Sequence, residues 1–386
     1  MRRRGFVRAV ALGAALGAAL AGAASATAAG AGSAAAPTGV RGARQDAPVR
    51  WVAVSVATLW VKPRQARPVD APSLAVPADP RAWVAAMSVA QKLWLVGHLE
   101  TQALLGDKVY VLATSGAWSK VAVAGQPTPR EKLGYPGWLP TKQLTAPAPA
   151  SAEREAVVTR PTTWLWTSAG LDERVMQVSY ATRLPAVSWT ASAVEVATPG
   201  GAHAFVPRAA VALRAAGEPL ETPSGAQVVA EARRFLGLQY LWAGTAGFGF
   251  DCSGFTSSVF RVLGVTIPRD AGPQSTFGRA VKARASLRAG DLVFFRNSAG
   301  DVHHVGICVG GGRMIHAPST GSAVSELSLA TEPYASEFTG GRGHGRSRPD
   351  GRCAPASGLD CVRARCGLCR RPRRRAEARV RDADCR

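Results

Sequence analysis

Several residue types are missing from long parts of this 386-residue sequence, and each absence restricts what the chain can form. Beyond Arg342 there is no lysine, isoleucine, phenylalanine, tryptophan or tyrosine. A segment so poor in large apolar side chains cannot bury enough surface to build a core. After the first 30 residues no apolar run approaches the ~20 residues that a membrane-spanning helix needs, so we expect no stable membrane anchor.

Cysteine is scarce outside the C-terminal tail, residues 341–386. Only Cys252 and Cys308 precede this tail, which holds the other five of the seven cysteines. The pair Cys366 and Cys369 has no second close pair beside it, so the spacing does not support a zinc site, and we expect no metal or other cofactor. The abrupt change in composition leads to the hypothesis that this disordered, Arg- and Cys-rich tail is a frameshifted or otherwise non-native end.

Acidic residues are also few, with 26 Asp and Glu against 47 Lys and Arg and a formal net charge of +21. Such a charge is typical of nucleic-acid binding, but here it is concentrated at the two ends. Residues 1–47 carry +5 and residues 342–386 carry +9, which leaves +7 for the 294 residues between. We therefore expect no nucleic-acid partner. A mildly basic central part suits attraction to an anionic cell wall.

Residues 1–28 have the pattern of an export signal. Arginines within the first eight residues precede an Ala/Leu/Gly run, and residues 24–26 supply small side chains for cleavage. The twin-arginine route and the general secretory route both fit this pattern. We expect a secreted or cell-wall associated protein in which residues 29–49 form a flexible leader.

Nine of the ten tryptophans lie between Trp51 and Trp189. Short alternating stretches in this part, such as residues 108–112, are separated by Pro, Gly and Asp turns, a pattern typical of small antiparallel β-barrels. We expect two such domains, covering residues 50–147 and 152–214.

Cys252 lies where the sequence predicts the start of a buried helix, because Phe255, Val259 and Val262 recur behind it at helical spacing. Free N–H groups and the positive dipole end of a helix favour a thiolate, which is the reactive form of a cysteine nucleophile. The alternative is that Cys252 is a small buried hydrophobe that opens a helix.

Two histidines are predicted to lie on one β-hairpin. Glycines at 310–312 are expected to form its turn, and His304 and His316 are equidistant from Gly310, which makes them direct or diagonal cross-strand neighbours. This arrangement predicts His304 as the general base that serves Cys252, with His316 orienting its ring. The alternative is a pair of satisfied core histidines.

Five sequence blocks resemble, in order, those of the NlpC-type peptidoglycan endopeptidases, which are papain-like cysteine peptidases with a Cys-His-His site. The blocks are Phe235-Leu-Gly-Leu-Gln-Tyr-Leu-Trp-Ala-Gly244, Phe250-Asp-Cys-Ser-Gly-Phe255, Ile267-Pro-Arg-Asp270, Gly290-Asp-Leu-Val-Phe-Phe295, and His304-Val-Gly-Ile through Met314-Ile-His-Ala-Pro318. By this resemblance the fold is α+β, and residues 222–340 form a catalytic domain with an antiparallel half-barrel and the nucleophile helix packed against it.

The resemblance also implies roles for other residues. Tyr240 matches a tyrosine whose hydroxyl helps to bind the oxyanion, together with the backbone N–H of the nucleophile. Asp251, Ser253 and Asp270 match positions that line the substrate groove. As alternatives, Asp251 caps the helix and Asp270 pairs with Arg269 at a turn.

The two upstream domains resemble the bacterial SH3-like modules that often precede NlpC-type domains. In relatives with two such modules, the first packs over the groove and narrows the substrate to short peptides with a free amino terminus. Glu100 and Tyr135 are our candidates for that wall, although a Tyr-Pro-Gly-Trp turn is also compatible with a tyrosine that only packs.

We therefore predict a monomeric, secreted cysteine endopeptidase that hydrolyses the bond between D-glutamate and the diamino acid in peptidoglycan stem peptides or muropeptides. Two alternatives remain open. One is an amidase or acyltransferase that uses the same three residues, and the other is a non-catalytic cell-wall-binding protein in which the β-barrels carry the function.

Overall fold

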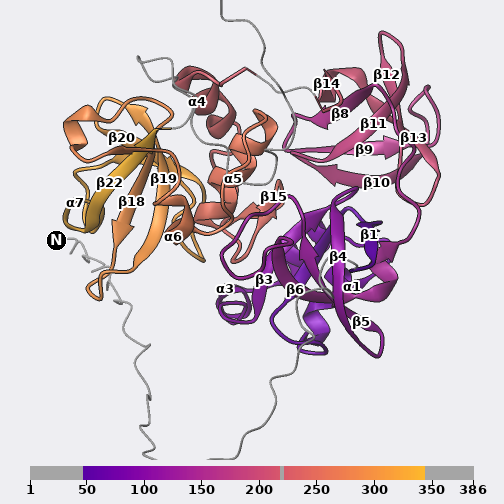
Figure 1. The fold of residues 1–386 in the computed structure, drawn as a ribbon, viewed down its shortest axis with the longest axis horizontal. Coiled ribbons are helices and arrows are strands. Elements are labelled where there is room, and N and C mark those ends of the chain that lie inside the picture. The colour runs from indigo at the N-terminus through magenta and orange to yellow at the C-terminus, as the bar shows by residue number, and fades with distance from the viewer. Residues whose placement is uncertain (1–46, 218–220, 344–386) are drawn as a thin grey trace, which may run out of the picture. The chain divides into compact units, whose positions relative to one another are not determined.

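The structure is a computed structural model that describes residues 47–217 and 221–343. The expected export signal and the tail beyond Gly343 lie outside the described residues, as does most of the expected leader. Within them the chain forms two seven-stranded sheets, a six-stranded sheet and a two-stranded ribbon, and the strands of each sheet pair antiparallel (Figure 1). None of the helices in these two segments is both long and apolar enough to cross a bilayer.

The first domain is a sheet with the strand order β3-β2-β6-β5-β4-β1-β7 and a helical insertion between β2 and β3. Its elements are β1 (Val49–Val52), β2 (Val56–Trp60), η1 (Pro68–Asp70), α1 (Ala71–Leu74), α2 (Pro80–Ala86), α3 (Val89–Leu93), β3 (Leu99–Leu104), β4 (Lys108–Ser115), β5 (Trp118–Val123), β6 (Tyr135–Pro140), η2 (Thr141–Gln143) and β7 (Leu144–Thr145). The insertion is held together by Asp70, whose buried carboxylate accepts hydrogen bonds from the Trp83 indole and the Arg67 guanidinium.

The second domain repeats this plan with the order β10-β9-β13-β12-β11-β8-β14. Its elements are β8 (Arg154–Val158), β9 (Thr162–Trp166), β10 (Arg174–Ser179), β11 (Arg183–Trp189), β12 (Ala193–Ala197), β13 (His203–Pro207), η3 (Arg208–Ala210) and β14 (Val211–Ala215). Alternate side chains of these strands form its small core, because successive residues of a strand face opposite sides of the sheet.

The third domain places helices against a sheet of order β17-β22-β18-β19-β20-β21. Its elements are α4 (Gly225–Arg233), β15 (Thr245–Ala246), β16 (Gly249–Phe250), α5 (Cys252–Val262), α6 (Ala271–Gln274), β17 (Arg279–Val281), η4 (Arg284–Ser286), β18 (Leu292–Arg296), β19 (Val302–Gly310), β20 (Arg313–His316), β21 (Ser325–Ser328), α7 (Tyr334–Glu337) and β22 (Phe338–Gly343). Helix α5 packs on β19 and on α4. The predicted α+β architecture is confirmed.

The last strand extends past the domain boundary that we expected at Gly340. Strand β22 continues to Gly343 and lies inside the sheet, between β17 and β18. Its glycines suit this crowded position, since a Cβ on Gly341 would lie 2.6 Å from Cδ2 of Leu287. The domain end that we expected from the change in composition is therefore three residues too early. Backbone pairing holds this strand in the sheet without large side chains.

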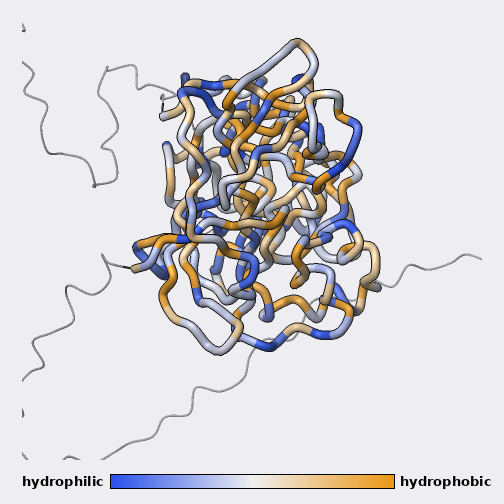
Figure 2. The backbone as a smooth tube through the Cα atoms, turned by 90° about the vertical axis from the view of Figure 1, so that its right-hand side faces the viewer, coloured by the Kyte–Doolittle hydropathy of each residue, from blue (hydrophilic) through white to orange (hydrophobic). Residues whose placement is uncertain are grey.

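The apolar core of the third domain extends into the other two. Phe255 of α5 belongs to a buried cluster that also contains Val56 of the first domain and Val157 of the second. Figure 2 shows orange and blue residues following one another over short lengths of the chain, as expected for strands that bury one face. This shared core fixes the first domain beside the loops that follow α5.

Candidate active site

Cys252 is the first residue of helix α5, which confirms the predicted helix start. The helix begins there because the Asp251 side chain caps it, accepting a hydrogen bond of 2.6 Å from the Gly254 N–H. Phe255 and Val259 are fully buried behind it and anchor the helix in the core. Cys252 itself is partly exposed and is a free thiol.

Gly254 allows the start of α5 to pack closely against the chain that precedes it. A Cβ at this position would lie 2.0 Å from the backbone oxygen of Gly244. Any side chain would therefore push the first turn, and with it the sulfur of Cys252, out of place.

The predicted hairpin is formed by β19 and β20, and it joins the two histidines. Ile307 pairs with Ile315, so the residue opposite His316 is Gly306, and His304 is its diagonal neighbour. His304 Nε2 lies 2.8 Å from His316 Nδ1, and the two ring centroids are 5.0 Å apart. Gly306 is required at this point, since its Cβ would lie 2.8 Å from the Met314 sulfur and 3.3 Å from the Cβ of His316.

The sulfur of Cys252 faces strand β19 directly beside His304. The backbone N–H of Val305, the next residue in that strand, hydrogen-bonds to the sulfur and lowers the thiol pKa, and the N–H of Ser253 acts in the same direction. Because His304 Nε2 is taken by His316, Nδ1 is the ring nitrogen of His304 left for the thiol. The structure thus places the Cys252 sulfur against the residue that follows His304 in β19, and it joins His304 to His316 by a hydrogen bond.

Burial of the site works against the thiolate that the helix start favours. Burial raises the pKa of the Cys252 thiol to about 12, with a further increase from the Asp251 carboxylate. Burial also holds the pKa of His304 well below its usual value and lowers the pKa of His316 to about 4. The helix N-terminus does not compensate for the lost hydration of a buried charge.

Tyr240 lies beside the thiol in a buried position, 6 % exposed. Its backbone is held on both sides, since its N–H donates to Ser322 O and its neighbour Leu241 donates to Phe250 O. Burial raises the pKa of the Tyr240 hydroxyl, and the nearby Cys252 raises it further. Within the described residues no protein group hydrogen-bonds to this hydroxyl, so it remains a neutral donor next to the sulfur.

Asp251 and Ser253 are bound to Arg269, a residue that our sequence reasoning did not select. Arg269 donates to both carboxylate oxygens of Asp251, at 3.1 and 2.6 Å, and to the Ser253 hydroxyl at 3.0 Å. Its remaining nitrogen donates to Thr101 of β3. Asp251 therefore caps the helix, as in the alternative interpretation. The ion pair with Arg269 that we considered for Asp270 is formed by Asp251 instead.

Asp270 is linked to the first domain by a chain of polar contacts. Tyr135, on β6, donates from its hydroxyl to Asp270 Oδ1 at 3.1 Å. The same hydroxyl accepts a 3.1 Å hydrogen bond from Arg130, whose two terminal nitrogens also bind both carboxylate oxygens of Glu100. The structure thus brings together Glu100, Tyr135 and Asp270, and adds Arg130 between them.

Tyr334 is another neighbour of the site that sequence reasoning missed. Its ring centroid lies 5.6 Å from that of His304 and 5.0 Å from that of His316. The nearby Cys252 is one cause, after burial, that raises the pKa of Tyr334 to about 12. No motif marks this tyrosine, because it comes from α7, a single helical turn far along the chain from the three site residues.

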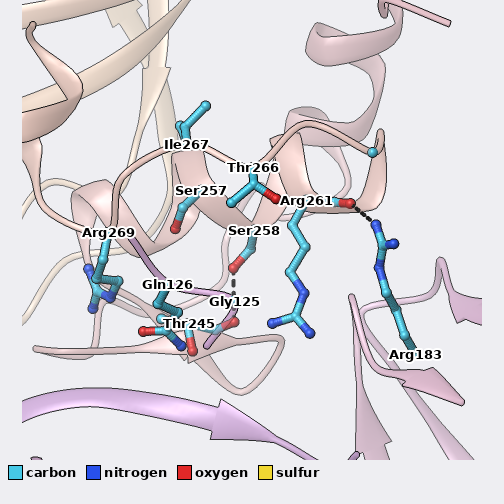
Figure 3. Close-up of a pocket in the computed structure, with 11 residues that line it drawn as sticks. Gly125, Gln126, Arg183, Thr245, Ser257, Ser258, Arg261, Thr266, Ile267 and Arg269 are labelled. Carbon is cyan, nitrogen blue, oxygen red and sulfur yellow. Dashed lines mark hydrogen bonds between the residues drawn. The ribbon is translucent and has the colours of Figure 1, made fainter. Parts of the chain in front are cut away.

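A cavity of about 220 Å³ lies against the other face of α5. Ser257, Ser258 and Arg261 line it, and they follow Cys252 by five to nine residues, which turns them to the opposite side of the helix. Figure 3 shows Arg183 from the second domain hydrogen-bonded to the carbonyl oxygen of Arg261 at its edge. Cys252 does not line this cavity, and neither does either histidine of the site.

In the described residues there is no group of three or more His, Cys, Asp or Glu side chains arranged to hold a metal ion. A thiol at a helix start, beside a hydrogen-bonded imidazole pair on an antiparallel sheet, defines a cysteine hydrolase of the papain-like class.

Comparison with known proteins identifies the family within that class. The model of the NlpC/P60 family matches residues 237–343, and that of the YKFC SH3b2 domain matches residues 158–213. The chain belongs to the NlpC/P60 family, and the predictions of a cysteine peptidase and of SH3-like domains before it are confirmed.

Three relatives match most of the chain. A gamma-D-glutamyl-L-lysine dipeptidyl-peptidase of Bacillus cereus is 43% identical over 299 residues, which cover 76% of this chain and 90% of the relative. The protein of the same name from Bacillus subtilis is 36% identical and covers 74% and 95%. The crystal structure of an NlpC/P60 family protein from Bacillus cereus has a TM-score of 0.73 at 41% identity and covers 77% and 100%.

Proposed function

We propose that this protein is a secreted cysteine peptidase that hydrolyses the bond between γ-D-glutamate and the diamino acid in peptides released from peptidoglycan. The observation that carries the proposal is the Cys252 thiol at the start of α5, held against β19 next to His304, whose ring is hydrogen-bonded to His316. The relatives from two Bacillus species, which are named for cleavage after γ-D-glutamate, support the choice of bond.

The reaction begins with a neutral thiol and a neutral imidazole. As the Cys252 sulfur attacks the γ-carbonyl carbon, its proton passes to Nδ1 of His304, so that charge develops only in the transition state. Once His304 is protonated, its Nε2–H can donate only to His316 Nδ1, 2.8 Å away, which stabilises the imidazolium. His304 then gives its proton to the leaving α-amine of the diamino acid and later activates the water that hydrolyses the thioester.

The oxyanion of the tetrahedral intermediate is assigned to two donors. These are the Tyr240 hydroxyl and the backbone N–H of Cys252, which lies in the first turn of α5 and has no partner within the helix. A neutral hydroxyl in a buried site suits this role, because a preorganised donor gains strength where water is excluded.

The substrate wall supports a peptide with a free amino terminus. Asp270 and Glu100 are carboxylates on either side of Tyr135, and Asp270 forms no ion pair among the described residues. Burial raises the pKa of Asp270 more than the nearby Arg269 and the hydrogen bond from Tyr135 lower it, so a further cation at this carboxylate would be favourable. A terminal ammonium group would provide that cation. Asp251 and Ser253, bound to Arg269, form the floor of the groove beside the sulfur.

Cleavage of defined peptides tests the proposal. The full chain is incubated with L-alanyl-γ-D-glutamyl-L-lysine, and the fragments are identified by mass. We expect L-alanyl-D-glutamate and lysine as products, no cleavage by the Cys252→Ala variant, and an unchanged rate in the presence of a chelator. Cys308→Ala is the matched control, because Cys308 is buried in the sheet away from the histidines and its loss should leave the rate nearly unchanged. Release of free alanine in place of lysine, or activity that survives Cys252→Ala, would refute the assignment.

A further inference from the structure

Arg130 holds Glu100, one of the two carboxylates that the proposed function places beside the amino terminus of the substrate. Its Nη1 and Nη2 bind the two carboxylate oxygens of Glu100 at 2.5 and 2.8 Å, a bidentate arrangement that leaves neither oxygen free of a cation. Its guanidinium carbon also lies 5.2 Å from the Tyr135 ring centroid. An ammonium group cannot reach the Glu100 oxygens in the same way while Arg130 holds both.

The charges around the groove add up to a single unmet negative charge. Three carboxylates, Glu100, Asp251 and Asp270, face the two guanidinium groups of Arg130 and Arg269. Arg269 is buried and fully engaged by Asp251, whereas Arg130 pairs with Glu100. One ammonium group from a peptide can meet this charge at Asp270, or it can take the place of Arg130 on Glu100.

The position of Arg130 favours exchange. Its side chain is 45% exposed, while that of Glu100 is only 14% exposed, so the guanidinium can return to water but the carboxylate cannot. Arg130 belongs to the loop between β5 and β6, whose base is fixed by the buried Gln126 side chain and by a hydrogen bond from Arg269 N to Pro127 O. Half-exposed ion pairs are weak, so a small rotation of one side chain is enough to open Glu100.

We propose that Arg130 is a tethered competitor of the substrate's terminal ammonium group: it holds Glu100 in the free enzyme, and a peptide with a free amino terminus binds by taking its place. This rests on the proposed function. A peptide without that amine leaves the Arg130–Glu100 pair in place, so Arg130 affects the binding only of peptides that carry the charge. The cost is a lower affinity for the correct peptide, since only the fraction of molecules with Glu100 open can accept it.

The test compares two peptides in steady-state kinetics. One is L-alanyl-γ-D-glutamyl-L-lysine, and the other is its des-amino analogue, in which a propionyl group replaces alanine. For Arg130→Gln we expect KM for the free-amine peptide to fall about fivefold, with kcat within about twofold, because the competing ion pair is gone. KM for the des-amino peptide should stay unchanged, since that peptide has no charge to place on Glu100.

Two further variants complete the comparison. Lys132→Gln removes the same charge from an exposed position of the same loop and should change neither KM. Arg130→Lys keeps the positive charge but has only one donor group for Glu100, so it should lower KM for the free-amine peptide about twofold. This variant serves as the test if the glutamine variant does not fold.

The results separate the possible roles of Arg130. A rise in KM for the free-amine peptide would mean that Arg130 holds Glu100 ready for the amine, and an equal fall for both peptides would mean a purely steric role. Either outcome in an active enzyme overturns this inference alone. A wild-type chain that cleaves neither peptide overturns the proposed function, and the inference with it.

Discussion

Replacement of His316 by asparagine should make the protein less sensitive to acid. His316 is fully buried, and its pKa is lowered to about 4 from the value of 6.5 that describes a solvated histidine. Because the folded state keeps this ring neutral, the unfolded state binds the extra proton between pH 6.5 and pH 4. Stability is therefore unaffected above pH 6.5 and is lost progressively as the pH falls through this window.

The size of the effect follows from the two pKa values. At pH 4 the linkage between protonation and unfolding gives a loss of about 3 kcal/mol for His316 alone, relative to pH 7. His304, whose pKa is also lowered by burial, adds to the loss in the same direction. Asparagine cannot titrate, and its side-chain oxygen can take the place of Nδ1 as the acceptor for His304, so the variant keeps the hydrogen bond and removes the titration.

Urea unfolding at a series of pH values between 7 and 4 measures the effect. The difference in unfolding free energy between the two ends of the range should be about 3 kcal/mol smaller for His316→Asn than for the wild type. His98→Asn, which removes a partly exposed imidazole stacked on Trp94, is the matched histidine variant measured in the same series. Parallel curves for His316→Asn and the wild type would refute the reasoning, because they would show that His316 does not gain a proton on unfolding in this range.

Two other substitutions test the donors and charges of the site. Tyr240→Phe should lower kcat by roughly 10²- to 10³-fold with little change in thermal stability, because it removes one oxyanion donor and no hydrogen bond of the resting protein; a kcat within a few-fold of the wild type would exclude the hydroxyl from this role. Arg269→Met should reduce the unfolding free energy measured in urea by about 3–5 kcal/mol, because it leaves Asp251 buried without a cation. The matched Arg313→Met, which breaks a half-exposed pair with Glu326, should cost less than about 1 kcal/mol, and equal losses for the two would contradict the assignment.

Local sequence patterns predicted the elements that carry the proposed reacting residues. The helical spacing behind Cys252 placed it at the start of a helix, and the glycine turn placed His304 and His316 on facing strands. The sequence left open whether they are direct or diagonal neighbours, because an irregularity between Cys308 and Gly310 shifts the register of the hairpin. Short-range periodicity predicts the position of a residue well where a single helix or hairpin determines that position.

The polar wall could be predicted only in part. Glu100 and Tyr135 were selected through a resemblance, but Arg130 lies in a loop whose sequence carries no periodic signal. Its contact with Glu100 spans 30 residues, and the Tyr135 contact with Asp270 spans 135. Such contacts depend on how two domains pack. The same packing decides whether Arg269 pairs with Asp251 or with Asp270.

The neutral state of the thiol connects the packing of α5 to the working conditions of the enzyme. A cysteine reacts with oxidants mainly as the thiolate, and burial raises the pKa of Cys252, which disfavours that form in the resting protein. Attack on a bound carbonyl remains possible, because His304 lies next in the strand to the residue that hydrogen-bonds the sulfur, and it can take the proton during the reaction. For a protein exported to an oxidising compartment, as we propose, this arrangement protects the nucleophile until a peptide fills the groove, and it explains how a site without a resting thiolate can still be built for thiol chemistry.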